Sequence, residues 1–70
     1  MGAIITFYHK NRDKRLKYFT QEFYVSDTEL ILYSCGEADS YAKSDICDAR
    51  VSYDGGVTWG GLFEGVLKNG

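Results

Sequence analysis

The sequence predicts a single, small all-β domain, and three observations lead to this fold class. The chain has 70 residues, which suits one domain, and it contains no proline, a residue that interrupts strand pairing. Aromatic residues make up 16% of the chain, and Tyr and Phe favour strands. Runs of alternating apolar and polar residues are separated by short polar or glycine-containing stretches. We therefore expect one domain, residues 1–70, of about five antiparallel strands in a small curved sheet or barrel.

The first half of the chain predicts a β-hairpin. Residues 3–9 are good β-formers, with Phe7 expected to face the core and His9 expected at the strand end, partly solvated. Residues 10–15 form a charged turn, and residues 16–25 return as the second strand. Alternation along this second strand gives two faces: Phe19, Phe23 and Val25 towards the core, and Tyr18, Thr20, Glu22 and Tyr24 on the other side, where with Tyr8 they would form an aromatic surface.

The middle of the chain predicts a turn and a buried strand. Residues 26–29 are polar, and the short apolar run 30–33 suits a buried strand better than an amphipathic helix. Ser34 and Glu37 fit a helix cap. We therefore expect one or two helical turns within residues 37–44, with a loop as the alternative.

Residues 46–53 show the clearest alternation and predict the next strand. Its two faces consist of Cys47, Ala49, Val51 and Tyr53 on one side and Asp48, Arg50 and Ser52 on the other. Cys35 and Cys47 are the only cysteines, and with no secretion signal we expect two reduced, partly buried thiols. The alternative is a disulfide that closes the short loop between them.

The segment from Ser52 to Trp59 predicts a tight turn between two strands. Asp54 can accept hydrogen bonds from backbone N–H groups and from the Thr58 hydroxyl, while adjacent glycines allow positive φ angles. Trp59 can cover the turn with its ring. We expect the chain to return as a strand from Thr58 to about residue 67, weakened by its glycines.

This segment resembles the Asp-box, a β-hairpin motif of sialidase-type propellers and other β-proteins. The matching positions are Ser52, Asp54, Gly56, Thr58 and Trp59. The resemblance implies a folding element that lies away from any active site. A single copy in so short a chain excludes a propeller, which needs several blades, and the arginine cluster of the sialidases is absent.

Charge is unevenly distributed along the chain. Residues 22–54 carry eight carboxylates and two basic side chains, although the net charge of the whole chain is only −2. An acidic surface can bind a basic groove of a partner protein and block it. In size and charge the chain is similar to phage-encoded inhibitors of host defence nucleases, including anti-CRISPR proteins. We therefore predict a small, non-enzymatic, protein-binding or inhibitory module, with an acidic surface made of Glu37, Asp39, Asp45 and Asp48.

A basic segment favours an alternative function, nucleic-acid binding. Residues 10–17 carry five Lys or Arg side chains and one Asp, with aromatic residues on both sides. Cations bind phosphates and exposed aromatic rings stack on bases. The residues of this candidate surface are Tyr8, Lys10, Arg12, Lys14, Arg15, Lys17 and Tyr18.

An enzymatic function is less well supported by the sequence. Some small microbial ribonucleases carry an Asp-box-like hairpin, but their chemistry requires a Glu, an Arg and a His together. His9 is the only histidine and lies far from the hairpin in sequence. We also expect no metal site, no cofactor and no membrane segment, and a cytoplasmic protein.

Overall fold

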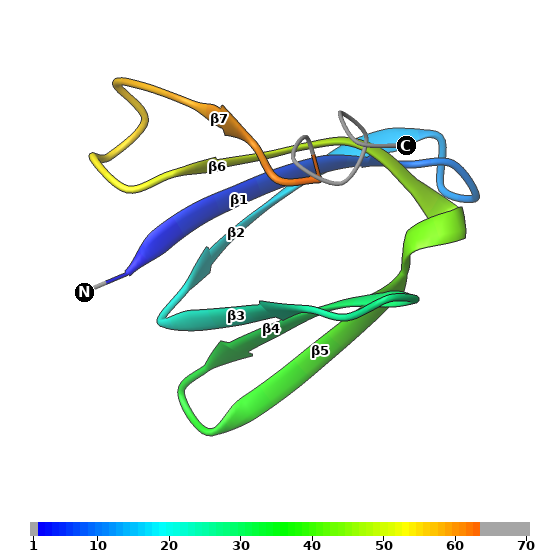
Figure 1. Ribbon diagram of the computed structural model, residues 1–70, viewed down its shortest axis with the longest axis horizontal. Helices are drawn as coiled ribbons and strands as arrows, with labels where there is room; N and C mark the ends of the chain where they lie inside the picture. Colours follow the sequence, from blue (N-terminus) through cyan, green and yellow to red (C-terminus); the bar gives the residue numbers. More distant parts are fainter. Residues whose placement is uncertain (1, 64–70) are drawn as a thin grey trace.

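The computed structural model describes residues 2–63 and shows an all-β fold, as predicted from the sequence (Figure 1). These residues form seven strands, more than the five expected, and one turn of 3-10 helix. The elements are β1 (Ala3–His9), β2 (Lys14–Thr20), β3 (Glu22–Val25), β4 (Glu29–Ser34), β5 (Glu37–Ala42), the 3-10 turn (Lys43–Asp45), β6 (Ile46–Ser52) and β7 (Gly60–Gly61).

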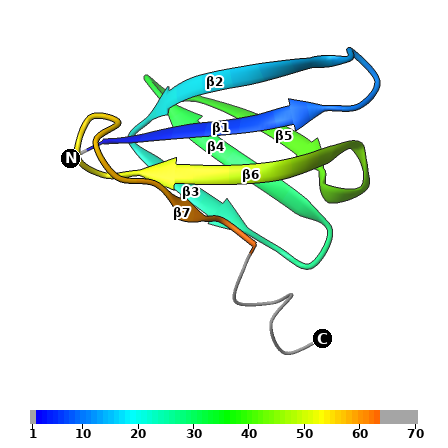
Figure 2. The ribbon, with the colours of Figure 1, turned by 90° about the horizontal axis from the view of Figure 1, so that it is seen from above.

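The strands form two antiparallel sheets packed face to face rather than a closed barrel. One sheet has the order β2-β1-β6-β7 and the other the order β3-β4-β5. Figure 2 shows the four-stranded sheet lying above the three-stranded sheet. The chain leaves the four-stranded sheet after β2 and returns to it through the 3-10 turn and β6.

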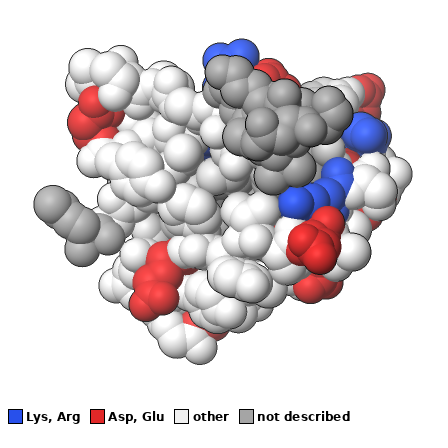
Figure 3. Space-filling view, viewed as in Figure 1, with Lys and Arg blue, Asp and Glu red and all other residues white. Residues whose placement is uncertain are grey.

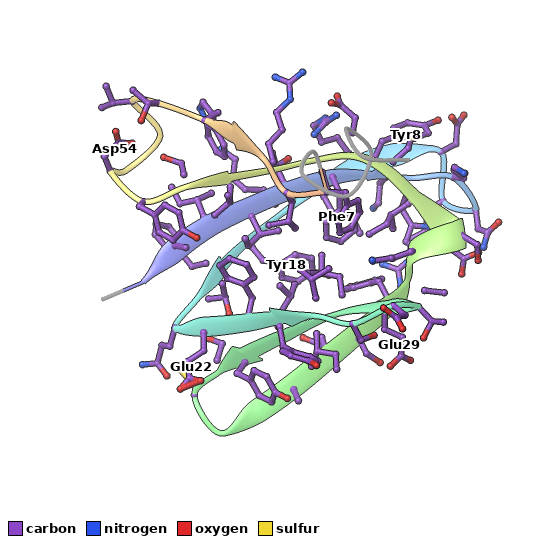
Figure 4. All side chains as sticks on the ribbon, viewed as in Figure 1. Phe7, Tyr8, Tyr18, Glu22, Glu29 and Asp54 are labelled. Atoms are coloured by element: carbon purple, nitrogen blue, oxygen red, sulfur yellow. The ribbon has the colours of Figure 1, made fainter. Side chains whose placement is uncertain are left out.

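The core lies between the two sheets. Ile5 and Phe7 of β1 are fully buried, and Leu30 and Leu32 of β4 pack against them from the other sheet. In Figure 4, Phe7 points into the space between the sheets, as the sequence predicted. A domain of this size has a small core, so each of these side chains contributes a large share of its stability.

A pair of tyrosines completes the core. The rings of Tyr18 and Tyr41 pack beside Phe7, with centroids 5.9 Å and 5.0 Å from its ring. Their hydroxyl groups share a hydrogen bond between the sheets. Burial, followed by this bond to Tyr18, raises the pKa of Tyr41 to about 12. The phenol therefore stays neutral and keeps its hydrogen bond over the physiological pH range.

The prediction of one continuous strand over residues 16–25 was wrong at Gln21. The chain bends there and passes from β2 in one sheet to β3 in the other. The single hydrogen of the buried Thr20 hydroxyl is shared between the carbonyls of Glu22 (2.5 Å) and Tyr33 (2.8 Å). The Gln21 N–H donates to the same Tyr33 carbonyl (3.0 Å). These bonds satisfy backbone groups that the bend removes from the regular ladder.

The bend also reverses the alternation of side chains. Tyr18 and Thr20 face the core before it, whereas Phe23 and Val25 pack against the core after it. The prediction was therefore correct for β3 and wrong for β2. Phe19, expected in the core, is 75% exposed, and Tyr18, expected on an aromatic outer surface, is not on it.

Residues 37–42 form a strand, and the expected helical turns are absent there. A two-residue turn explains the difference, because Cys35 and Gly36 both adopt positive φ angles (52° and 80°). Such a turn aligns the flanking strands for pairing, and Ser34 pairs directly with Glu37. The pattern that suggested a helix cap therefore belongs to a hairpin, and within residues 2–63 only Lys43–Asp45 is helical, as one 3-10 turn.

The observed faces of β6 differ from the predicted ones because the strand contains a β-bulge. Thr6 pairs with Arg50 and Tyr8 pairs with Cys47, so Asp48 and Ala49 together oppose one residue of β1. Asp48 adopts a positive φ of 53° at this bulge. Cys47 is consequently exposed, although it was expected on the same face as the buried Ala49.

Both cysteines are free and exposed, where reduced and partly buried thiols were expected. No disulfide joins them, so the alternative is also excluded in this structure. The last expected strand is much shorter than predicted, because β7 comprises only Gly60–Gly61. The remainder of that expectation, residues 64–67, lies outside the described residues. Within residues 2–63, no helix is long and apolar enough to cross a bilayer.

Candidate functional site

The four acidic residues proposed from the sequence do not form one surface. Glu37 and Asp39 lie exposed on the edge strand β5, and Asp45 lies half-buried in the 3-10 turn. Asp48 lies on β6 in the other sheet, where it forms ion pairs with Arg15 (2.5 Å) and Arg50 (3.2 Å). The predicted acidic surface is thus divided between the two sheets.

The structure instead gathers negative charge on the three-stranded sheet. Between residues 18 and 42 the chain carries five carboxylates and no Lys or Arg, and all five are exposed. They are Glu22, Asp27, Glu29, Glu37 and Asp39. In Figure 3, the lower part of the molecule, over β3–β5, shows acidic side chains without basic ones between them. This sheet therefore presents a negative potential that no basic neighbour on the same sheet neutralises.

Two tyrosines lie on the outer face of the same sheet. Tyr24 and Tyr33 are 59% and 42% exposed, and the half-buried Ile31 lies between them, since it pairs with Tyr24 and is two residues from Tyr33. No segment within residues 2–63 packs over these rings. We call this surface the acidic–aromatic face; it consists of Glu22, Tyr24, Glu29, Ile31, Tyr33, Ala38 and Ser40.

The arrangement of this face suits contact with another macromolecule. Glu22 and Glu29 lie at opposite ends of the three-stranded sheet (Figure 4). Ala38 and Ser40 on β5 are small, so a partner can approach the tyrosines from that edge. Tyr is enriched at protein interfaces, because it buries a large ring and still presents a polar hydroxyl group.

The basic residues proposed from the sequence are only partly brought together. Arg15 and Lys17 alternate along the outer face of the four-stranded sheet, beside Tyr8 and Thr6 of β1. The other three cations lie at or near the β1–β2 turn, and Tyr18 lies in the core instead. Those three are Lys10, Arg12 and Lys14. The Tyr8 hydroxyl donates to Asp13 across this turn.

One aromatic ring and one cation of this outer surface were not predicted from the sequence. Phe19 is exposed beside Lys17 on β2, and Arg50 joins the surface from β6. Phe19 was assigned to the core because the bend at Gln21 was not expected. Arg50 was distant in sequence from the basic segment, and only the pairing of β1 with β6 places it there.

His9 is buried rather than partly solvated, with 7% of its surface exposed. Its ring meets Tyr41 edge to face at a centroid distance of 5.7 Å, and its Nδ1 has no hydrogen-bond partner among the described residues. A general acid must reach its substrate. This position therefore gives no support to the ribonuclease alternative.

The turn between β6 and β7 is organised around Asp54. Its Oδ1 accepts hydrogen bonds from the N–H groups of Val57 (3.1 Å) and Thr58 (3.0 Å) and from the Ser52 hydroxyl (2.8 Å). Its Oδ2 accepts the Thr58 hydroxyl at 2.6 Å. The Thr58 hydroxyl first, then the backbone and Ser52 donors, hold the pKa of this carboxyl well below its usual range.

The remainder of the turn fits the contacts expected from the sequence. Gly55 and Gly56 have φ angles of 78° and 99°, and the Trp59 indole N–H donates to the Gly56 carbonyl at 3.1 Å. The Gly56 N–H donates to the Ser52 hydroxyl at 2.8 Å. The segment is thus a self-contained folding element. Its relationship to the Asp-box hairpins of other proteins stays a prediction.

No family model matches this chain, and neither does any curated protein or solved structure compared with it. Within residues 2–63, no group of three His, Cys, Asp or Glu side chains could hold a metal ion. The two exposed sheet faces are therefore the features from which a function can be argued.

Proposed function

We propose that the protein is a non-enzymatic, protein-binding module that places its acidic–aromatic face on a basic surface of a partner protein. The observation that supports the proposal most strongly is two exposed tyrosines on the same sheet face as Glu22 and Glu29, in a segment, residues 18–42, that carries no Lys or Arg. Aromatic anchors supply most of the energy at such interfaces. The surrounding carboxylates select a partner of opposite charge and accelerate the encounter.

The proposal includes an inhibitory role. Basic surfaces on proteins are frequently the places where nucleic acid binds, because cations neutralise phosphates. A small domain that covers such a surface prevents the nucleic acid from reaching it. A phage origin, suggested only by size and charge, would fit this role, since host defence nucleases have such basic grooves.

The test is affinity capture with the wild-type chain, followed by measured affinities of variants for the purified captured protein. Tyr33→Ala is expected to weaken binding by about 30-fold, the effect of losing one aromatic anchor of about 2 kcal/mol. The double variant Glu22→Lys, Glu29→Lys is expected to slow association and reduce its salt dependence.

Two control variants lie outside the face. Tyr53→Ala removes another exposed tyrosine, and Asp45→Lys reverses a carboxylate of the 3-10 turn. Neither is expected to change the affinity appreciably. Equal affinities for wild type, Tyr33→Ala and the double Lys variant would exclude the acidic–aromatic face as the binding surface.

A further inference from the structure

The outer face of the four-stranded sheet carries three cations around one threonine. Lys17 of β2 and Arg50 of β6 pair with Thr6 of β1 from opposite sides. Arg15, two residues from Lys17, donates to the Thr6 hydroxyl at 3.2 Å. Directly paired residues in a sheet have Cβ atoms about 5 Å apart, so Lys17 and Arg50 lie on either side of Thr6, within about 10 Å of each other.

Asp48 fixes the direction of two of these cations. Its Oδ2 accepts from the terminal nitrogen of Arg15 at 2.5 Å, and its Oδ1 accepts from Nε of Arg50 at 3.2 Å. The bulge at Asp48 places the carboxylate between the two guanidinium groups. Within residues 2–63, the Arg50 side chain makes no other hydrogen bond, so its two terminal nitrogens remain available to a ligand. A held arginine loses less entropy on binding than a free one.

Aromatic rings lie on both sides of the cation group. Phe19, two residues from Lys17 on the same face of β2, is 75% exposed. On the other side, a shallow hollow is lined by Arg50, Trp59 and the two glycines of β7, together with neighbouring residues. An exposed phenylalanine contributes little to the fold, because its ring stays in water.

From this arrangement we infer that the outer face of the four-stranded sheet binds single-stranded nucleic acid. We call it the basic face; it consists of Thr6, Tyr8, Arg15, Lys17, Phe19, Asp48 and Arg50. The three cations neutralise phosphates, and Phe19 stacks on an unpaired base. Bases in a duplex are already stacked on one another, so the exposed ring favours a single strand. The inference is independent of the protein-binding function proposed above, because it uses the opposite sheet.

The distribution of charge also determines where the strand can lie. The three-stranded sheet repels phosphates through its five carboxylates, whereas the basic face attracts them. A polyanion is therefore directed to one side of the molecule, although the net charge of the whole chain is negative.

The test is fluorescence anisotropy with labelled, mixed-sequence single-stranded RNA and DNA of about twelve nucleotides, and with a duplex of the same sequence. The wild type is expected to bind the single strands at about 50 mM salt. Its affinity should fall with a slope of about −1.4 in log affinity against log salt, for two neutralised phosphates, because Asp48 cancels one of the three positive charges. Circular dichroism establishes that each variant keeps the wild-type fold.

Two variants separate the ionic contribution from the stacking contribution. Lys17→Gln should weaken binding and reduce the magnitude of the salt slope by about 0.7, the value for one phosphate contact on a single strand. Phe19→Ala should weaken binding by about 5- to 160-fold and leave the salt slope unchanged, because stacking releases no counterions. Lys43→Gln and Tyr53→Ala, which change a cation and a tyrosine outside the face, should match the wild type.

Three results would overturn the inference. The first is that the wild type does not bind single strands at about 50 mM salt. The second is that Lys43→Gln and Lys17→Gln lose the same affinity. The third is that the duplex binds as tightly as the single strands and that its binding does not depend on Phe19. The first result would also be expected if the basic face binds an acidic protein instead. Capture of the protein partner by Phe19→Ala reports on the proposed function separately, since that variant leaves the acidic–aromatic face intact.

Discussion

Phe7→Ala is expected to leave a large fraction of the protein, about half, unfolded at 25 °C. The Phe7 ring is fully buried between the sheets and packs on Tyr18 and Tyr41. Truncating a buried phenylalanine to alanine costs about 3–5 kcal/mol, which is comparable to the total stability of about 3–5 kcal/mol expected for a domain this small. Urea denaturation followed by circular dichroism measures the difference.

Phe19→Ala is the matched control for Phe7→Ala. It removes the same ring from an exposed position on the neighbouring strand, so the free energy of unfolding should change by less than about 0.5 kcal/mol. If Phe19→Ala proved as destabilising as Phe7→Ala, the bend at Gln21 and the resulting exchange of faces in β2 would be wrong.

Asp54→Ala is expected to lower the melting temperature by about 4–8 °C, the shift caused by losing about one hydrogen bond's contribution in a domain of this size. The substitution leaves the N–H groups of Val57 and Thr58 and two hydroxyl groups without their acceptor. Asp27→Ala, in the exposed turn between β3 and β4, is the control and should melt close to the wild type. Equal melting temperatures for the two variants would contradict the role given to Asp54.

The effect of Asp54 should depend on pH. Its pKa in the folded protein is lower than in the unfolded chain, so it contributes stability while it is ionised in both states, above about pH 5. That contribution is lost as the pH falls from about 4 towards the lower, folded pKa. The difference in melting temperature between wild type and Asp54→Ala should therefore shrink below about pH 4. A difference that stays constant down to about pH 2 would exclude the ionised carboxylate as its cause.

The fold class and the first strand could be predicted because they depend on local patterns. β1 is a run of β-forming residues, and the Asp54 turn contains its own donors, acceptor and glycines within eight residues. The strand of residues 37–42 was missed for a related reason. Ser34 and Glu37 match the pattern of a helix cap, whereas the hairpin turn that they flank depends on a positive φ angle at Cys35, which few non-glycine residues adopt.

The faces of β2 and β6 could not be predicted, because each depends on one irregular residue. The bend at Gln21 and the bulge at Asp48 shift the alternation of side chains by one position. Such a shift exchanges the buried and exposed sets of the affected strand. The faces of Phe19 and Cys47 were predicted wrongly for this reason. Neither β2 with Gln21 nor β6 contains a proline or glycine that would mark the irregularity.

The sequence predicted that acidic and basic residues are separated along the chain. It did not predict which of these residues share a surface. Charge segregation is visible in the sequence, since residues 18–42 contain no Lys or Arg. The division of the acidic residues between two sheets, and the position of Arg50 across Thr6 from Lys17, follow from the pairing of β6 with β1. Those contacts join distant parts of the chain, which local patterns do not reveal.

The same pairing of β1 with β6 has a consequence for the order of folding. It brings Ile4 opposite Ser52, so nearly fifty residues must be closed into a loop before the contact forms. The strands β3, β4 and β5 follow one another through short connections, and hairpins of this kind form within about 1–10 μs. We expect the three-stranded meander to gain protection from amide exchange first and the pairing of the first and sixth strands to be the slow step. If pulse-labelled hydrogen exchange showed that the amides of β1 become protected before those of β4, this expected order would be wrong.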